Sequence, residues 1–484
     1  MAADLAKNRF VGRLIMNPLW QALLRWGFMA ALIGLIFTAV GLEKLPGVAD
    51  PYPLLYTNAA TLLFWVLWFM GIVLLSPLLG RAWCSVCPLG FMSDRIGRIG
   101  LNLPWPAKWA RNLGPLAVFG AGVAAALLLD AHKSPNLTAF TVGLAALLAV
   151  ASALLWRRAA FCGFFCPVGT VLSLYGRFSP IKVGMRVEGA CQKCAEHGCV
   201  ARTSTWRRWD FGTLVIHKKV YTSGCPVALD PPTMDASECL LCMECVRRCP
   251  SSNLGVHFGR RTSMKPLHGA PLFLLAPLAG LVILVLIRTW PELRDALAPG
   301  VYPPVWVWAA WFGLLIPALF LFAPALLELL GVNLSSVPSE EPEGADPGRP
   351  AKVKKQGFAW AAARYAAPFA GPVLGAHMAV ALVKLNAKAA YVPYLFYDPF
   401  GATTYMAIHV TGALGLPPML LAMCVLRIAA PALLALGIFL GMWDAARLWK
   451  KPLGAVPRAG AWLCFGALST LYGATLVHWL LAGK

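Results

Sequence analysis

Charged residues are scarce in this chain, and acidic residues are scarcer than basic ones. Asp, Glu, Lys and Arg make up only 13% of the 484 residues, with 21 acidic against 42 basic side chains. The mean hydropathy is +0.66. These values exclude an ordinary soluble globular protein and are typical of a chain that crosses a membrane several times.

Other features that the sequence lacks narrow its function. No basic, aromatic-interleaved soluble domain is present, so we expect no nucleic acid partner despite the net charge of +21. No convincing small-residue cleavage site follows the first apolar stretch, which we therefore expect to stay as an anchor. No acid–base pair, nucleophile constellation or phosphate-cradling loop stands out, and nothing suggests a disulfide framework.

Nine apolar stretches are long enough to span a bilayer, and they predict a mainly α polytopic membrane helix bundle of about nine spans. They lie at about 20–42, 57–79, 112–131, 136–157, 269–290, 304–330, 359–384, 417–443 and 459–482. The region 403–445 has room for two crossings, but glycines and prolines at 412–418 interrupt it. We prefer a single crossing there, preceded by a re-entrant or interfacial segment.

The distribution of basic residues predicts how the spans are oriented. The amino-terminal segment and the segments after the second and fourth spans are rich in Lys and Arg, whereas the loops that hold Glu43 and Glu292 are not. We therefore expect a multi-pass protein of the cell inner membrane whose amino terminus and cysteine-rich insert face the cytoplasm. The carboxyl terminus is then expected on the outer side.

The sequence divides into five predicted regions. Residues 1–176 hold two duplicated two-span hairpins, and residues 177–265 form a soluble cytoplasmic insert. Residues 266–330 hold two further spans, and residues 359–484 hold the carboxyl-terminal spans. Residues 331–358 are rich in Pro, Glu and Gly, a composition that is typical of a flexible loop without a core.

Twelve of the 14 cysteines lie between residues 84 and 249, at spacings that suit metal ligands. Four of them form the run Cys239-x2-Cys242-x2-Cys245-x3-Cys249, and Pro250 follows directly. Thiolates at this spacing, ending in Cys-Pro, are the bacterial-type ferredoxin pattern for a [4Fe–4S] cluster. The run therefore predicts one-electron transfer.

A partner set of cysteines precedes this run within the insert and completes a predicted small α+β domain of the two-cluster ferredoxin type. In such domains the last cysteine of each run ligates the other cluster. The rule predicts two ligand sets: Cys225, Cys239, Cys242 and Cys245 for one [4Fe–4S] cluster, and Cys191, Cys194, Cys199 and Cys249 for the second. A structural zinc site is the alternative, because paired Cys-x2-Cys elements also bind zinc.

Two more cysteine pairs lie at the predicted cytoplasmic ends of the second and fourth spans. Cys84 and Cys87 belong to a Cys-x2-Cys-Pro-x-Gly motif, and Cys162 and Cys166 to a Cys-x3-Cys-Pro-x-Gly motif. Each motif follows a two-span hairpin, so the first four spans resemble a duplicated unit. The four soft thiolates are candidate ligands of a third metal site. The alternatives are a dithiol role for each pair, or buried inert cysteines in tight turns.

At these residues the chain resembles the NapH/NosR/CcoG-type membrane polyferredoxins. The resemblance covers roughly residues 20–290, with the duplicated hairpins, both Cys-Pro-x-Gly motifs and the insert. It implies a quinol-linked electron-transfer protein of a respiratory chain with [4Fe–4S] clusters on the cytoplasmic side, although one branch of the family serves copper-oxidase assembly. The first motif departs from the usual Cys-x3-Cys-Pro of the family, because Cys84 and Cys87 are one residue closer.

Three histidines lie in or near apolar stretches of the carboxyl-terminal half: His377, His409 and His478. Ionisable groups inside a membrane are functional candidates. His377 is a candidate for contact with quinone, and His377 together with His409 or His478 for ligation of a b-type haem. A satisfied structural histidine is the alternative to both roles.

These patterns predict a membrane-bound 4Fe–4S electron-transfer protein that links the quinone pool, or a cytoplasmic donor, to a redox partner protein. The chain is then either the quinol-oxidising subunit itself or a relay. One alternative is a metallocentre assembly or metal-handling factor of the copper-oxidase type that uses the clusters as reductant. Another is a transporter with a structural zinc domain.

Overall fold

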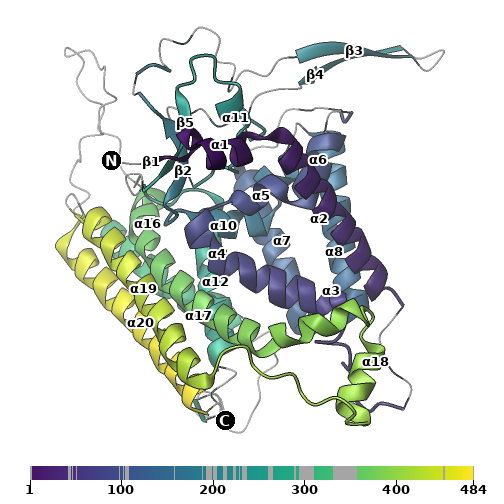
Figure 1. Ribbon diagram of the computed structural model, residues 1–484. Coiled ribbons are helices and arrows are strands. Elements are labelled where there is room, and N and C mark those ends of the chain that lie inside the picture. Colours follow the sequence, from purple (N-terminus) through teal and green to yellow (C-terminus); the bar gives the residue numbers. More distant parts are fainter. Residues whose placement is uncertain are drawn as a thin grey trace. The chain divides into compact units, whose positions relative to one another are not determined.

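The computed structural model of the chain is mostly helical (Figure 1). The residues it describes are 3–41, 45, 47–50, 52–97, 99–101, 103, 108–156, 159–187, 189–191, 194, 199, 204–210, 215–221, 225–227, 229, 231, 237–259, 265–287, 290, 292–293, 310–330, 357–450 and 453–482. The chain forms two compact units. The first comprises Met1–Thr262 and Lys384–Leu420, and the second comprises Ser263–Val383 and Leu421–Lys484.

Four long apolar segments form the helical frame of the first unit. They are α2 (Pro18–Ala39), the continuous α3 (Ala59–Thr61), η2 (Leu62–Trp68) and α4 (Phe69–Leu79), then α7 (Lys108–Leu128) and α8 (Pro135–Leu155). Three of these segments begin where a polar side chain accepts a hydrogen bond from the first turn: Asn17, Asn58 and Ser134. Such caps satisfy N–H groups that the helix itself leaves without partners.

Each pair of spans is followed by two short helices, and the two copies interlock. The short helices are α5 (Ala82–Val86) and α6 (Pro88–Ile96) in the first copy, and α9 (Ala160–Phe164) and α10 (Pro167–Gly176) in the second. Helix α6 packs against α8 of the other copy, and α10 packs against α4. This exchange brings all four short helices to one end of the spans, where Figure 1 also shows α5, α6 and α10.

The insert is built on a small antiparallel sheet with strand order β1-β5-β2. Its strands are β1 (Ala3–Asp4), β2 (Ile181–Met185) and β5 (Leu254–Phe258), and the short helix α11 (Glu244–Arg247) precedes β5. Val183 pairs with Val256, and both are buried in the core of the insert. The chain's amino-terminal strand is held in this sheet by Arg186, whose Nε lies 2.7 Å from Asp4 Oδ2.

Three further elements complete the insert end of the first unit. The short helices η1 (Leu5–Lys7) and α1 (Arg9–Met16) lead from β1 to the first long span. A separate antiparallel hairpin consists of β3 (Ser204–Asp210) and β4 (Val215–Tyr221), which Figure 1 shows extending away from the sheet of the insert.

The segment Lys384–Leu420 packs in the first unit at the end opposite the cysteines. It holds η5 (Ala389–Phe396), α18 (Ala402–Tyr405) and η6 (Met406–Val410). The fully buried Asn58 ties it to the hairpin, because its Nδ2 donates to Thr38 O at 2.9 Å and to Phe400 O at 3.1 Å. Tyr405 adds a hydrogen bond to Asp50 at 3.2 Å.

The second unit is a bundle of apolar helices. Its helices are α12 (Ala270–Ile287), η3 (Trp311–Leu315), α15 (Ile316–Leu330), α16 (Phe358–Ala366), η4 (Ala367–Phe369), most of α17 (Ala370–Lys388), α19 (Met423–Leu448) and α20 (Ala455–Ala482). The buried Glu328 connects three of them, because it accepts hydrogen bonds from Tyr365 Oη at 2.8 Å and from the Gly454 N–H at 3.1 Å. It thereby satisfies a backbone donor at the start of α20.

The predicted fold class, a polytopic helical protein with a small α+β domain, is confirmed. In the part of the chain that the structure describes, eight helices are long and apolar enough to cross a membrane, and a shorter apolar helix lies at Asn112–Leu128. In the region 403–445, where the sequence leaves room for two crossings, one long helix follows the short α18 and η6. The predicted flexible loop at 331–358 lies almost wholly outside the described residues.

Candidate iron–sulfur sites

The two membrane-edge cysteine pairs converge at one end of the interlocked hairpins. Cys84 lies within α5 and Cys162 within α9, whereas Cys87 and Cys166 each directly precede the proline that begins α6 or α10. The two pairs lie near each other, because the pKa values of Cys87, Cys162 and Cys166 are each raised in part by a cysteine of the other copy. We call this group of four cysteines the membrane-edge site.

Helix amino termini support the membrane-edge site with backbone N–H groups. Cys166 is the N-cap residue of α10, and the Gly169 N–H donates to its Sγ at 3.3 Å. In the first copy, the Gly90 N–H makes the corresponding hydrogen bond to the Cys87 thiol. The amino terminus of a helix carries partial positive charge and stabilises a thiolate. Both Cys-Pro turns therefore offset part of the cost of ionising the sulfurs, as metal ligation requires.

The glycine of each motif leaves space beside the sulfurs. A Cβ on Gly90 would lie 3.5 Å from Cys162 Sγ and 3.9 Å from Cys87 Cβ, so Gly90 faces cysteines of both copies. A Cβ on Gly169 would lie 3.6 Å from Cys166 Sγ. Because a side chain at either position would occupy this space, the Cys-Pro-x-Gly motif fits a cradle for an inorganic group.

The acid–base chemistry of these thiols fits a soft cationic group. Burial, with a smaller contribution from the neighbouring thiols, raises the pKa of Cys87 to about 12 and that of Cys166 to about 11. Burial also raises the pKa of Cys162. Such thiols stay protonated at neutral pH until a metal centre displaces the protons, which is how thiolate sites are loaded.

In the insert, Cys225 lies with three members of the later cysteine run: Cys239, Cys242 and Cys245. Burial raises the pKa of Cys239 to about 11 and that of Cys242 to about 12. The Leu241 N–H donates to Cys239 Sγ at 3.4 Å. Leu241 itself has a left-handed φ of 52°, which bends the loop between its cysteines. This is the first ligand set that the crossed-ligand rule predicts.

The fourth cysteine of the later run lies instead with the earlier set. Burial raises the pKa of Cys199, and the nearby thiols of Cys249, Cys191 and Cys194 raise it further. The buried Asn253 joins the two runs, because its Nδ2 donates to Cys191 Sγ at 3.5 Å and its N–H donates to Cys249 Sγ at 3.2 Å. Burial opposes ionisation of Cys249, but hydrogen bonds from Ser251 and from nearby backbone N–H groups hold its pKa below the usual value.

The structure therefore brings the cysteines of each set close to one another, both in the two insert sets and in the membrane-edge site. That these sets bind clusters stays a prediction. In the described part of the chain, no three His, Cys, Asp or Glu side chains lie close enough to hold a single metal ion. A [4Fe–4S] cluster takes one thiolate on each iron, so its ligands stand farther apart than those of one ion. The absence of a single-ion site among the described residues is therefore compatible with a cluster at each of the three groups.

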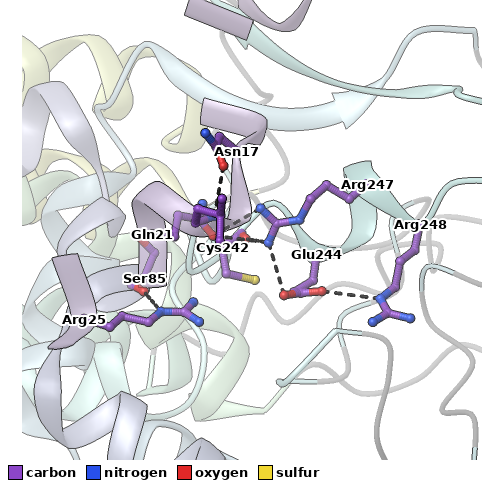
Figure 2. A network of polar contacts seen from close by, with 9 residues as sticks. Asn17, Gln21, Arg25, Ser85, Cys242, Glu244, Arg247 and Arg248 are labelled. Carbon is purple, nitrogen blue, oxygen red and sulfur yellow. Dashed lines mark hydrogen bonds and ion pairs between the residues drawn. The ribbon is translucent and has the colours of Figure 1, made fainter. Parts of the chain in front are cut away.

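Polar side chains on the first span connect the insert to the membrane-edge loop. Figure 2 shows Arg247 of α11 reaching Gln21 of α2, with both terminal nitrogens 3.2 Å from Gln21 Oε1. One turn along α2, Arg25 Nε donates to Ser85 O at 2.8 Å, within α5. Arg247 also donates to Cys242 O at 3.0 Å. The cysteine loop of the insert is thus anchored to the same helix as the loop of Cys84.

Sequence reasoning missed three of these supporting residues. Gln21 and Arg25 could have been predicted to make polar contacts, because they lie four residues apart at the start of an apolar span and so share one face of the helix. Asn253 carried none, since its role depends on the fold of two distant cysteine runs.

The three candidate histidines have different surroundings. His409 lies in the first unit, where its exposed ring is 4.8 Å from that of Tyr405. His377 and His478 lie in the second unit. His377 is buried within α17, whereas His478 stacks on Trp290 at 4.3 Å and lies 3.7 Å from Glu292. Their roles in quinone or haem binding remain predictions.

Comparisons with known proteins find a likeness to an iron–sulfur family in the duplicated hairpins. A family model described as a 4Fe-4S binding domain matches residues 61–106 and 138–186, one match for each copy of the cysteine motif. The Escherichia coli (strain K12) protein named "Putative electron transport protein YccM" is 27% identical over 217 residues, which cover 38% of this chain. The match spans about half of that relative, 53% of its length. No solved structure matches the chain.

The fold, the placement of the cysteines and both matches support one class of protein. This is a protein with helices long and apolar enough to span a membrane that carries two matches to a 4Fe-4S binding domain. The family match falls on the membrane-edge site rather than on the insert, so it supports iron–sulfur binding at the pair of motifs whose role the sequence alone leaves open.

Proposed function

We propose that this chain passes electrons between the quinone pool, or a cytoplasmic donor, and a redox partner protein through three [4Fe–4S] centres. Two centres belong to the insert, which we place on the cytoplasmic side of the inner membrane, and the third belongs to the membrane-edge site. The single observation that carries this proposal is the convergence of four half-buried cysteines from two copies of a matched 4Fe-4S motif, next to a ferredoxin-type insert.

The chain's own residues supply three things to such a relay. Partial burial limits the access of water to the sulfurs, so nearby charges and dipoles act more strongly on them. N–H groups at the starts of α6 and α10, and those of Leu241 and Asn253, hydrogen-bond the thiolates and tune their electron affinity. Gln21 ties the insert to α2 through Arg247, and Arg25 ties the loop of Cys84 to the same helix. A bound [4Fe–4S] cluster would supply reversible one-electron chemistry.

The number of centres is tested by iron and acid-labile sulfide per chain in anaerobically purified protein, with EPR after dithionite reduction. About twelve irons support three clusters, and about eight support clusters in the insert alone. Zinc without iron would overturn the electron-transfer proposal and favour a structural zinc domain.

The role of the membrane-edge site is tested by Cys84→Ser and Cys166→Ser, with the exposed Cys424→Ser as the matched control. We expect both test variants to lose about four irons, and with them the reduction of the insert clusters by a quinol analogue. The control should keep both. Variants that still reduce the insert clusters, but no longer support maturation of a copper oxidase, would favour the assembly role.

The part played by quinone is tested with His377→Ala, because His377 is the buried histidine among the three candidates. If His377 contacts quinone, the variant requires more quinol analogue for half-maximal cluster reduction, while reduction by dithionite is unchanged. A haem absorbance band in the purified wild-type protein would instead assign His377 to haem ligation.

A further inference from the structure

One buried arginine lies between the membrane-edge site and the insert. Arg81 precedes α5 by one position and is 9% exposed. Its Nη1 donates to Glu238 O at 3.1 Å, the carbonyl directly before Cys239. Its Nη2 would lie 3.0 Å from a Cβ on Gly169, the glycine whose N–H donates to Cys166 Sγ. A single guanidinium therefore contacts the surroundings of two cysteine groups.

The charge of Arg81 acts on cysteines of both the membrane-edge site and the insert. At the membrane-edge site it hydrogen-bonds Cys84 and interacts with Cys162 and Cys166. On the insert side it lowers the pKa of Cys239, although burial outweighs this effect. A guanidinium stays protonated in proteins, so Arg81 places a permanent positive charge beside these sulfurs.

A further observation indicates that Arg81 does more than stabilise the hairpin. Its Nε is buried and has no hydrogen-bond partner among the described residues, a costly state for a charged donor unless a ligand satisfies it. The sequence counterpart of Arg81 in the second motif copy is Arg158, which lies outside the described residues.

We propose that Arg81 is a positioning residue that couples the membrane-edge centre to the insert centre of Cys225, Cys239, Cys242 and Cys245, so that the two are consecutive in the electron path. Its bidentate-capable guanidinium fixes the insert loop against the membrane-edge loop. Its buried positive charge favours the more negative, reduced state of both centres. This inference rests on the proposed function, because it requires a cluster at the membrane-edge site.

The test is an EPR-monitored redox titration of Arg81→Gln, Arg81→Lys and the control Arg95→Gln, each with its iron content. Arg81→Gln keeps a donor but removes the charge, so both centres should become about tenfold harder to reduce, which is ~59 mV for a one-electron couple. Arg81→Lys keeps the charge and should restore most of that shift. Arg95 is exposed on α6 over the Phe91 ring, and its substitution should change neither potential.

Several outcomes would overturn this assignment. If Arg81→Gln with full iron content shifts one centre or none, the residue does not couple the two. If Arg81→Lys shifts both potentials as far as Arg81→Gln, charge is not the cause. Should Arg81→Gln fail to load its clusters, the loaded Arg81→Lys variant still decides the question: potentials near wild type support the role of charge, and potentials far below it do not. Wild-type protein without iron at the membrane-edge site would instead refute the third cluster of the proposed function, and this inference would then be refuted too.

Discussion

The close crossing of α17 and α19 in the second unit allows a quantitative prediction. Both helices carry a Gly-x3-Gly pattern, Gly371 and Gly375 on α17 and Gly437 and Gly441 on α19. Small residues at this spacing let helix backbones approach closely in membranes. A Cβ on Gly371 would lie 2.4 Å from Gly437 O and 2.4 Å from Gly441 N.

The cost of Gly371→Ala follows from these distances. Ordinary contact of a Cβ begins near 3.4 Å, so the two helices must separate by about 1 Å, and a gap of that size forfeits roughly a quarter to a half of each dispersion contact across the crossing. We therefore expect a destabilisation of about 1–3 kcal/mol, as is usual for overpacking.

The assay is thermal unfolding of the purified protein in detergent, followed by the fluorescence of a thiol-reactive dye. Gly473→Ala on α20 is the matched control, because a Cβ there meets nothing within 4 Å. Alanine at that position should leave the apparent Tm unchanged or raise it slightly, since alanine favours helix by ~1 kcal/mol over glycine. Equal apparent Tm values for Gly371→Ala and wild type would refute the close backbone crossing.

Four other substitutions test contacts outside the cluster sites. Asn58→Leu leaves two carbonyls without a donor and should destabilise the first unit by about 2 kcal/mol, measured as a lower apparent Tm. Glu328→Ala removes the acceptor of the Tyr365 hydroxyl and should lower the apparent Tm, whereas Tyr365→Phe, which keeps the bond from α20, should lower it less. Burial opposes ionisation of Asp4, but the hydrogen bond from Arg186 holds its pKa below the usual value, so the stability that Asp4 contributes is present at neutral pH and is lost as the pH falls below 4. Hydrogen exchange in β1 should rise in that range, and Asp4→Asn should abolish this pH dependence.

Local chemistry explains why part of the candidate site could be predicted. The spacing of Cys239, Cys242 and Cys245 is set by the covalent chain, so it encodes a ligand loop wherever that loop lies in the fold. The apolar spans are predictable for a similar reason, because roughly twenty consecutive apolar residues have few stable environments other than a bilayer. Even the pairing of Cys225 with the later run follows from a rule about ferredoxin sequences.

The convergence of the membrane-edge cysteines depended on packing between segments that are distant in the sequence. Spacing places Cys84 beside Cys87 and Cys162 beside Cys166, but nothing local says that the two pairs meet. They meet because α6 packs on α8 and α10 packs on α4, an exchange that requires the shapes of four helices at once.

The same distinction separates the cysteine motifs from the residues that support them. The sequence by itself determined that this protein has apolar helices long enough to span a membrane and cysteines at ferredoxin-type spacing, since both signals are carried by neighbouring residues. Only the tertiary structure decided that Arg81 reaches Glu238, 157 positions away, and that Arg247 reaches Gln21, 226 positions away. Contacts of that kind result from the balance of burial and hydrogen bonding over the whole unit, and no local pattern of residue types carries that information.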